Sequence, residues 1–264
     1  MALEAPRSLS PSKVSAFTDC PLAFRLSIID RLPEPPSAPA VKGTLVHATL
    51  ERLFWDHERG ARTPEAARSA LDSAWRELQA DPEFVGLALT AEEAAVFLAD
   101  AQVLVDHYFA LEDPNAVTTI AVELGLEVDL GTMRLRGIID RLDRTEDGQL
   151  VVVDYKTGRA PSARFEHGKL IGVHIYALLC EAALGRAPVE VKLLHLRDPV
   201  SITAVPSEQS MRGQARRTTA VWSAIERACA TEDFRPRPSG LCRFCNFQSI
   251  CPAFAGDARL EAAS

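Results

Sequence analysis

Hydrophobic residues recur with a helical period through the first part of the chain. One set follows i, i+4, i+7, i+8 spacing: Val46, Leu50, Leu53 and Phe54. This spacing predicts an amphipathic helix. Two further helices are predicted, one capped by Thr63 with a proline after it and one opened by a capping box of Thr90 and Glu93. With a shorter helical segment over residues 10–29, the pattern predicts a helical region spanning residues 1–116.

From residue 117 the hydrophobic period changes from helical to two. Apolar residues alternate with polar ones in the first predicted strand: Ile120, Val122, Leu124, Leu126 and Val128. The same reading gives further strands over 133–142, 150–155, 189–196 and 201–205, and helices over 168–184 and 207–231. We therefore predict an α/β core over residues 117–232, followed by a cysteine segment over residues 233–264, within one continuous domain.

Composition narrows the classes of protein that the chain can belong to. Its 264 residues are 47% hydrophobic and 25% charged, which is typical of globular proteins and excludes collagen, coiled coil and bulk disorder. A net charge of −7 argues against a nonspecific polyphosphate coat, but allows a local basic groove or a carboxylate metal site. The sequence shows neither an apolar run of membrane-span length nor a signal core, so we expect a cytoplasmic protein without a membrane. It also lacks a phosphate-binding P-loop, which excludes an ATP-driven helicase.

Charged residues interrupt two predicted strands that are otherwise apolar. Asp154 and Lys156 stand two apart in VVVDYKTG and therefore share one face, while Asp140 ends the preceding strand in GIID. If the strands pair as a hairpin, two carboxylates and an ammonium meet at one end of the sheet. Such oxygen ligands suit magnesium, and the lysine could orient a metal-bound water. A structural ion pair is the alternative; taken singly, His47 is an ordinary helix histidine and Glu123 an exposed strand carboxylate.

Six cysteines are unevenly distributed along the chain. The C-terminal run CRFCNFQSIC contains Cys242, Cys245 and Cys251, and Cys20 lies near the start. Their clustering predicts metal binding, and because zinc and iron-sulfur clusters both use four thiolates, the count leaves both open. Cys180 and Cys229 lie in predicted helices and are interpreted as core thiols.

The order of charged motifs resembles the RecB-like exonuclease branch of the PD-(D/E)XK nuclease superfamily. The matching residues are His47 in GTLVH, Asp140 in GIID, Asp154 and Lys156 in VDYKTG, and Tyr176 in a following helix. The resemblance implies a restriction-endonuclease-like mixed sheet flanked by helices, and a metal-dependent exonuclease that hydrolyses DNA in repair or end processing. Because the sequence lacks a P-loop, unwinding, if required, would come from a separate helicase subunit.

That resemblance also implies a role for each matching residue. His47, Asp140 and Asp154 would bind Mg²⁺ or Mn²⁺, Lys156 would position the attacking water, and Asp140, Asp154 and Tyr176 would complete the catalytic group. The sequence departs from the family where Gly172 replaces a glutamine four residues before Tyr176. His174 is a substitute for that glutamine or a plain packing residue.

The split cysteine pattern resembles the iron-sulfur nucleases of the AddB type and of the CRISPR-associated exonucleases. It implies a [4Fe-4S] cluster on Cys20, Cys242, Cys245 and Cys251 that clamps the two chain ends together. Two other readings stay open at this point. One is a noncatalytic iron-sulfur DNA-binding module of a helicase-nuclease complex, and the other is a zinc-bound interaction protein.

Overall fold

The computed structural model of the chain describes residues 3–160 and 166–254, and only the backbone for residues 166–173. Contacts divide the chain into two compact units. Unit 1 comprises Met1–Pro35, Glu127–Arg136 and Arg212–Ser264, and unit 2 comprises Pro36–Leu126 and Gly137–Met211. The first unit therefore holds both ends of the chain.

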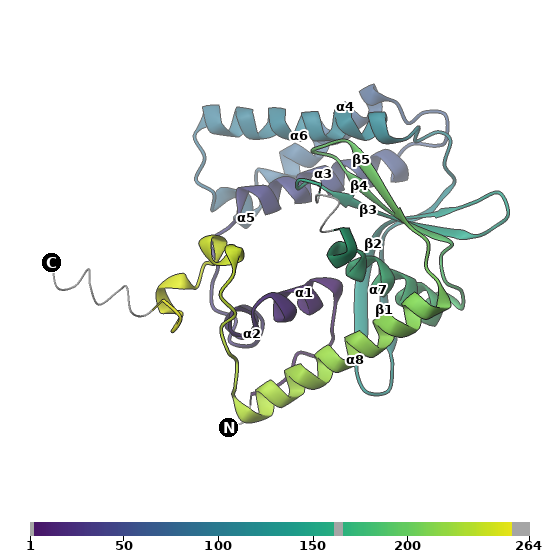
Figure 1. The fold of residues 1–264 in the computed structure, drawn as a ribbon. Coiled ribbons are helices and arrows are strands. Elements are labelled where there is room, and N and C mark those ends of the chain that lie inside the picture. Colours follow the sequence, from purple (N-terminus) through teal and green to yellow (C-terminus); the bar gives the residue numbers. More distant parts are fainter. Residues whose placement is uncertain (1–2, 161–165, 255–264) are drawn as a thin grey trace. The chain divides into compact units, whose positions relative to one another are not determined.

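Unit 2 begins with a group of helices that pack on one another (Figure 1). They are α3 (Ala38–Trp55), α4 (Pro64–Leu78), α5 (Pro82–Val85) and α6 (Ala91–Leu111). Both predicted caps are confirmed: the Thr63 hydroxyl accepts from the backbone N–H of Ala66 at 3.2 Å, and Thr90 and Glu93 form a reciprocal capping box. Such caps satisfy amide groups that the first helical turn leaves without partners, so local sequence fixes where α4 and α6 begin.

A five-stranded mixed sheet follows, in the order β1-β2-β3-β4-β5. Its strands are β1 (Thr119–Asp129), β2 (Arg134–Arg144), β3 (Leu150–Lys156), β4 (Glu190–His195) and β5 (Val200–Ala204). The predicted hairpin is confirmed, because β2 pairs antiparallel with β3 and places Arg141 opposite Val153. β3 and β4 are parallel, and β4 and β5 are antiparallel. The predicted mixed sheet flanked by helices is therefore present.

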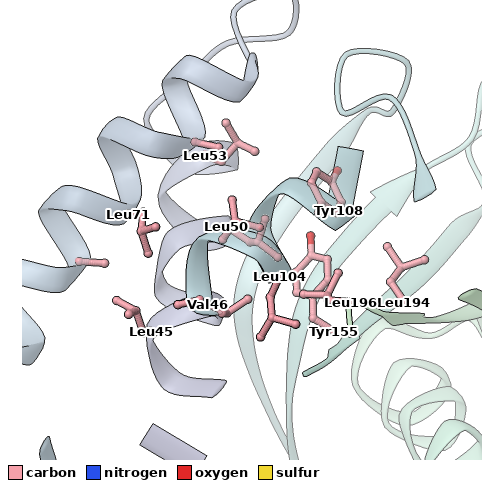
Figure 2. Close-up of a cluster of buried hydrophobic side chains, with 14 of the residues drawn as sticks. Leu45, Val46, Leu50, Leu53, Leu71, Leu104, Tyr108, Tyr155, Leu194 and Leu196 are labelled. Atoms are coloured by element: carbon pink, nitrogen blue, oxygen red, sulfur yellow. The ribbon is translucent and has the colours of Figure 1, made fainter. Parts of the chain in front are cut away.

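Different helices pack on different faces of the sheet. One face joins α3, α4 and α6 in a common hydrophobic core (Figure 2). Its members include Leu45, Val46, Leu50, Leu53, Leu71, Leu104, Tyr108, Tyr155, Leu194 and Leu196. Near β2, helix α7 (Glu166–Leu184) comes very close to the backbone: a Cβ on Gly137 would lie 2.7 Å from Leu179 Cδ1. Glycine at this position allows α7 to pack against the strand.

Helix α6 is the one described helix whose length and composition match a membrane span, with a mean hydropathy of 1.3. Its buried residues contribute to the unit 2 core: Phe97, Ala101, Leu104, Val105 and Tyr108. These residues lie on one face of α6, and that face packs into the unit 2 core.

Unit 1 assembles segments from both ends of the chain. They are α1 (Pro11–Asp19), α2 (Pro21–Phe24), the π-helical turn η1 (Arg25–Ile29), most of α8 (Glu208–Thr231), and the 3₁₀ turns η3 (Gly240–Phe244) and η4 (Gln248–Ile250). The predicted helical segment over residues 10–29 is interrupted at Cys20, whose backbone is extended. Pro21 explains the interruption, because a residue before proline avoids helical angles. The interruption turns the chain at the cysteine.

Candidate active site

The charged residues of β2 and β3 converge in unit 2 at the end of the hairpin. Asp140 and Asp154 lie one residue beyond the paired positions Arg141 and Val153. Lys156 forms an ion pair with Asp154, whose side chain is almost completely buried. The backbone N–H of Tyr155 donates to Asp140 Oδ2 at 2.7 Å. Strand pairing thus gathers two carboxylates and an ammonium within a small volume.

Two more potential ligands come from α3 and β1. His47 Nδ1 lies 3.5 Å from Asp140 Oδ2 and 4.0 Å from Glu123 Oε1. One ligand atom from each of His47, Glu123 and Asp140 lies within 4.8 Å of the other two. An imidazole nitrogen with two carboxylates is a donor set that fits a divalent transition metal or, through its oxygens, magnesium.

Glu123 differs from the exposed strand carboxylate that period-two alternation predicts. Its side chain is 32% exposed and faces the histidine. Its backbone has a φ of 45°, in the left-handed region, within β1. A non-glycine residue there is strained, and a left-handed residue within a strand turns its side chain away from the regular alternation. Sequence periodicity carries no signal of this conformation, which explains why the pattern gave Glu123 no special role.

Burial and mutual repulsion raise the pKa values of the clustered carboxyl groups. The pKa of Glu123 rises to about 7, first because of burial and then because of the charges of Asp140, Glu51 and Asp154. The pKa of Asp140 rises to about 6, mainly through burial and the neighbouring Asp154, although His47 opposes the rise. Carboxylates crowded in this way are costly to ionise unless a cation compensates them. The electrostatics therefore fit a cation site.

Helix α7 contributes Tyr176, whose hydroxyl donates to Asp154 Oδ1 at 3.1 Å. Burial and the charge of Asp154 raise the pKa of Tyr176 above its ordinary value, so the phenol remains a neutral donor. His174, in the same helix, is partly buried. Gly172 lies in the portion of α7 whose side-chain surroundings are outside the described residues.

A histidine, three carboxylates, a lysine and a tyrosine around the end of a mixed sheet can together bind a divalent metal and orient a water molecule for hydrolysis. Comparison with protein families agrees: the model of the PD-(D/E)XK nuclease superfamily matches residues 8–252. The chain belongs to the PD-(D/E)XK nuclease superfamily, whose members use divalent metals. It is thus a nuclease by family, and DNA is the substrate that this class implies.

Individual relatives include two mycobacteriophage proteins and one solved bacterial structure. The chain is 26% identical to the Gene 69 protein of Mycobacterium phage D29, over 93% of this chain and 96% of that protein. It is 29% identical to the Gene 69 protein of Mycobacterium phage L5, over 51% of this chain and 45% of that protein. A Eubacterium rectale structure, named as a candidate exonuclease, has a TM-score of 0.57 and 11% identity, covering 90% of this chain and 87% of that one. At this identity, the last match shows a shared fold.

Unit 1 contains a second cluster, made of cysteines. Cys20, Cys242, Cys245 and Cys251 all line one cavity of about 330 Å³. Backbone N–H groups point at two of the sulfurs: Arg237 N donates to Cys20 Sγ at 3.4 Å, and Ser239 N to Cys242 Sγ at 3.3 Å. Cys180 and Cys229 are buried elsewhere, as predicted for core thiols. The fold therefore brings the predicted four cysteines, from opposite chain ends, around one space.

Proposed function

We propose that the protein is a metal-dependent DNA exonuclease that hydrolyses phosphodiester bonds. The observation that carries this proposal is the convergence of Asp140, Asp154 and Lys156 at the end of the β2–β3 hairpin, beside His47. The family supports nuclease chemistry, and the residues present at the site match the requirements of that chemistry.

The donor set fits Mg²⁺ or Mn²⁺. His47, Asp140 and Asp154 would hold the cation, and we add Glu123 because its carboxylate lies within 4.8 Å of ligand atoms of His47 and Asp140. The raised pKa values of Glu123 and Asp140 support this assignment, because a bound cation would offset the repulsion that raises them. When bound, the cation would activate water and neutralise charge on the scissile phosphate.

Two further side chains would complete the catalytic group. Lys156 is about half exposed, so its ammonium can reach a water or a phosphate oxygen while its charge stays close to Asp154. We assign it the orientation of the attacking water. Tyr176 donates its hydroxyl proton to Asp154 and would hold that carboxylate in one orientation. Both roles depend on hydrogen bonds from fixed donors, which lower the barrier without reorganisation.

End-labelled linear DNA and a covalently closed circle, each incubated with Mg²⁺ or Mn²⁺, would test the proposal. We expect mononucleotide release from linear DNA, an intact circle, and no cleavage by Asp154→Ala. The matched control is Asp147→Ala, which removes an exposed carboxylate from the turn between the same two strands. Wild-type cleavage by Asp154→Ala would contradict the catalytic assignment. DNA binding without cleavage by the wild-type protein would favour the noncatalytic DNA-binding module.

We also propose that the four cysteines hold a [4Fe-4S] cluster. All four line one cavity, so thiolates from both ends of the chain can bind one group. The two N–H donors would stabilise thiolate charge. The choice of iron-sulfur over zinc rests on the split cysteine pattern, which resembles that of iron-sulfur nucleases. The cluster would fasten the N-terminal segment to the C-terminal one.

Anaerobic purification of the full chain followed by iron, sulfide and zinc analysis would test the cluster. Cys20→Ala should lose the visible absorption of the cluster and lower the melting temperature. Cys180→Ala is the matched control, because this thiol is fully buried away from the cavity and should leave the iron content unchanged. Stoichiometric zinc without iron, or a full cluster in Cys20→Ala, would contradict the proposal.

The biological setting that we propose is DNA repair or end processing in the cytoplasm. Because the chain lacks a P-loop, any unwinding would come from a separate helicase subunit. Stimulation of cleavage of duplex ends by a helicase and ATP would support this arrangement, and equal cleavage without them would contradict it.

A further inference from the structure

A buried polar network lies behind the candidate metal site, on the opposite face of the same strands. Neighbouring residues of a strand point to opposite faces, so Arg141 and Tyr155 face away from Asp140 and Asp154. Arg141 is fully buried, and Tyr155 is 3% exposed. Figure 2 shows Tyr155 inside the hydrophobic cluster with Leu104 and Tyr108. An ionised arginine in such a place requires a structural or functional reason.

The Arg141 guanidinium is held on several sides. Asp143 accepts from its Nε and Nη2 atoms at 2.9 to 3.1 Å, and Glu112 lies 2.5 Å from its Nη1 atom. The same nitrogen donates to the Tyr155 hydroxyl at 2.9 Å and to the Tyr108 hydroxyl at 3.2 Å. These contacts leave the guanidinium little freedom, so it is a rigid donor to the Tyr155 hydroxyl.

Tyr155 in turn contacts two of the proposed metal ligands by different parts of the residue. Its backbone N–H donates to Asp140 Oδ2 at 2.7 Å. Its ring packs edge-on against the His47 ring, with centroids 5.9 Å apart and an interplanar angle of 89°. One residue therefore contacts a ligand from β2 and a ligand from α3.

Helix α3 is attached to the network at a second point. Phe54 lies two turns after His47, and the Arg141 guanidinium stands over its ring at 4.4 Å. A cation over an aromatic face is attractive, more strongly so away from water. The same guanidinium thus holds α3 directly through Phe54 and, through the Tyr155 hydroxyl, supports the ring that packs on His47.

We propose that Tyr155 is a positioning residue for the metal site, its ring fixed by the hydrogen bond from Arg141. This inference rests on the proposed function, because it requires that His47 and Asp140 bind a divalent cation. Tyr155 touches neither cation nor substrate in this assignment. It sets the separation between the α3 imidazole and the β2 carboxylate, and loss of its hydroxyl should loosen that separation and weaken metal binding.

The test measures Mn²⁺ binding by titration calorimetry of the full chain, with the melting temperature of each variant recorded in EDTA. Tyr155→Phe removes only the hydroxyl, and Arg141 keeps Asp143 and Glu112, so the variant should fold. We expect its Mn²⁺ dissociation constant to rise at least about threefold. This is less than the roughly 10- to 100-fold loss typical of partners bonded directly to a ligand, because the Tyr155 hydroxyl acts through the ring. The matched control is Tyr108→Phe, which loses another hydroxyl that accepts from Arg141 but whose ring contacts do not include His47.

Tyr108→Phe should lower the melting temperature and leave Mn²⁺ affinity within about twofold of wild type. Equal affinities for wild type and Tyr155→Phe, or equal losses in both tyrosine variants, would overturn the positioning role. If Tyr155→Phe fails to fold, Arg141→Lys is tested instead, because it keeps the buried positive charge but not the guanidinium that donates to the Tyr155 hydroxyl. Unchanged Mn²⁺ affinity in that variant also overturns the positioning role. Asp140→Ala separates the two proposals, because Mn²⁺ binding that survives this change would refute the metal site itself.

Discussion

Asp140→Asn should make the metal-free protein more stable than wild type while removing its metal binding. The amide has nearly the same shape as the carboxylate, and its oxygen can still accept from the Tyr155 N–H, which now donates at 2.7 Å. What the change removes is a negative charge that is 10% exposed and lies beside Asp154. An inactive variant that is more stable than wild type is typical of a functional site whose charged groups destabilise the folded protein.

The magnitude follows from the pKa of Asp140, which rises from an ordinary 3.8 to about 6. At about 1.36 kcal/mol per unit, ionising this group in the folded protein costs about 3 kcal/mol at pH 8. Because the carboxyl pKa is higher in the folded protein, the free energy of unfolding is greatest below pH 3.8, falls as the pH rises from 3.8 to about 6, and is constant above that. Since Asp154 shares the repulsion, we expect a gain of about 1 to 3 kcal/mol at pH 8 and about half of it at pH 5.

Thermal or urea unfolding of the full chain in EDTA would measure this gain at both pH values. Asp143→Asn is the matched control, because it makes the same change on the same strand. Asp143 pairs with the buried Arg141, so its neutralisation should destabilise the protein by about 3 kcal/mol or more. In the presence of Mn²⁺, wild type and Asp143→Asn should gain stability, whereas Asp140→Asn should not.

A loss of stability in metal-free Asp140→Asn at pH 8 would refute the reasoning. It would mean that the attraction to His47 and Lys156 outweighs burial and the repulsion from Asp154, as in a structural ion pair. An equal gain at pH 5 and pH 8 would refute the electrostatic origin, because a neutral effect on packing does not depend on the ionisation of Asp140.

Three further predictions concern the same site. Lys156→Ala should reduce the rate of DNA cleavage at least about 100-fold with unchanged DNA binding, since it removes a charge that acts on the transition state. Near wild-type cleavage by this variant would exclude Lys156 from catalysis. Tyr176→Phe should reduce the rate roughly tenfold, because Asp154 loses a hydrogen bond worth about 1.5 kcal/mol; an unchanged single-turnover rate would contradict this. The affinity for Mn²⁺ should fall as the pH decreases through about 7, because protons then occupy Glu123, whose pKa is about 7. Calorimetry at pH 8, 7 and 6 should show this fall in wild type and a weaker fall in Glu123→Gln.

Local sequence determined most elements of the fold and the central part of the candidate site. The caps of α4 and α6 lie at the predicted residues because the interactions that form them span only three positions. Period-two geometry likewise placed Asp154 and Lys156 on one face, and a short turn placed Asp140 next to them. The caps, the strand alternation and the hairpin turn each involve residues close together in the chain, so they can be predicted from the sequence alone.

The pattern of hydrophobic and polar residues did not predict which side chains meet through tertiary packing. Glu123 joins His47 and Asp140 only because β1 contains a left-handed residue, which alternation does not reveal. In the sequence, Arg141 is one charge among several in GIIDRLDR. Its burial against the Phe54 ring depends on how α3 packs on the sheet. Such contacts depend on register and helix placement, which are properties of the whole core rather than of a segment.

The cysteines show the same division between sequence and structure. Their spacing was evident in the chain, and it predicted a metal site without deciding which metal. Tertiary structure decided how the two ends meet: Cys20 and the C-terminal run line one cavity of about 330 Å³. The physical reason is that spacing fixes the separation of ligands along the chain, whereas the volume that they enclose is set by the packing of segments from both chain ends.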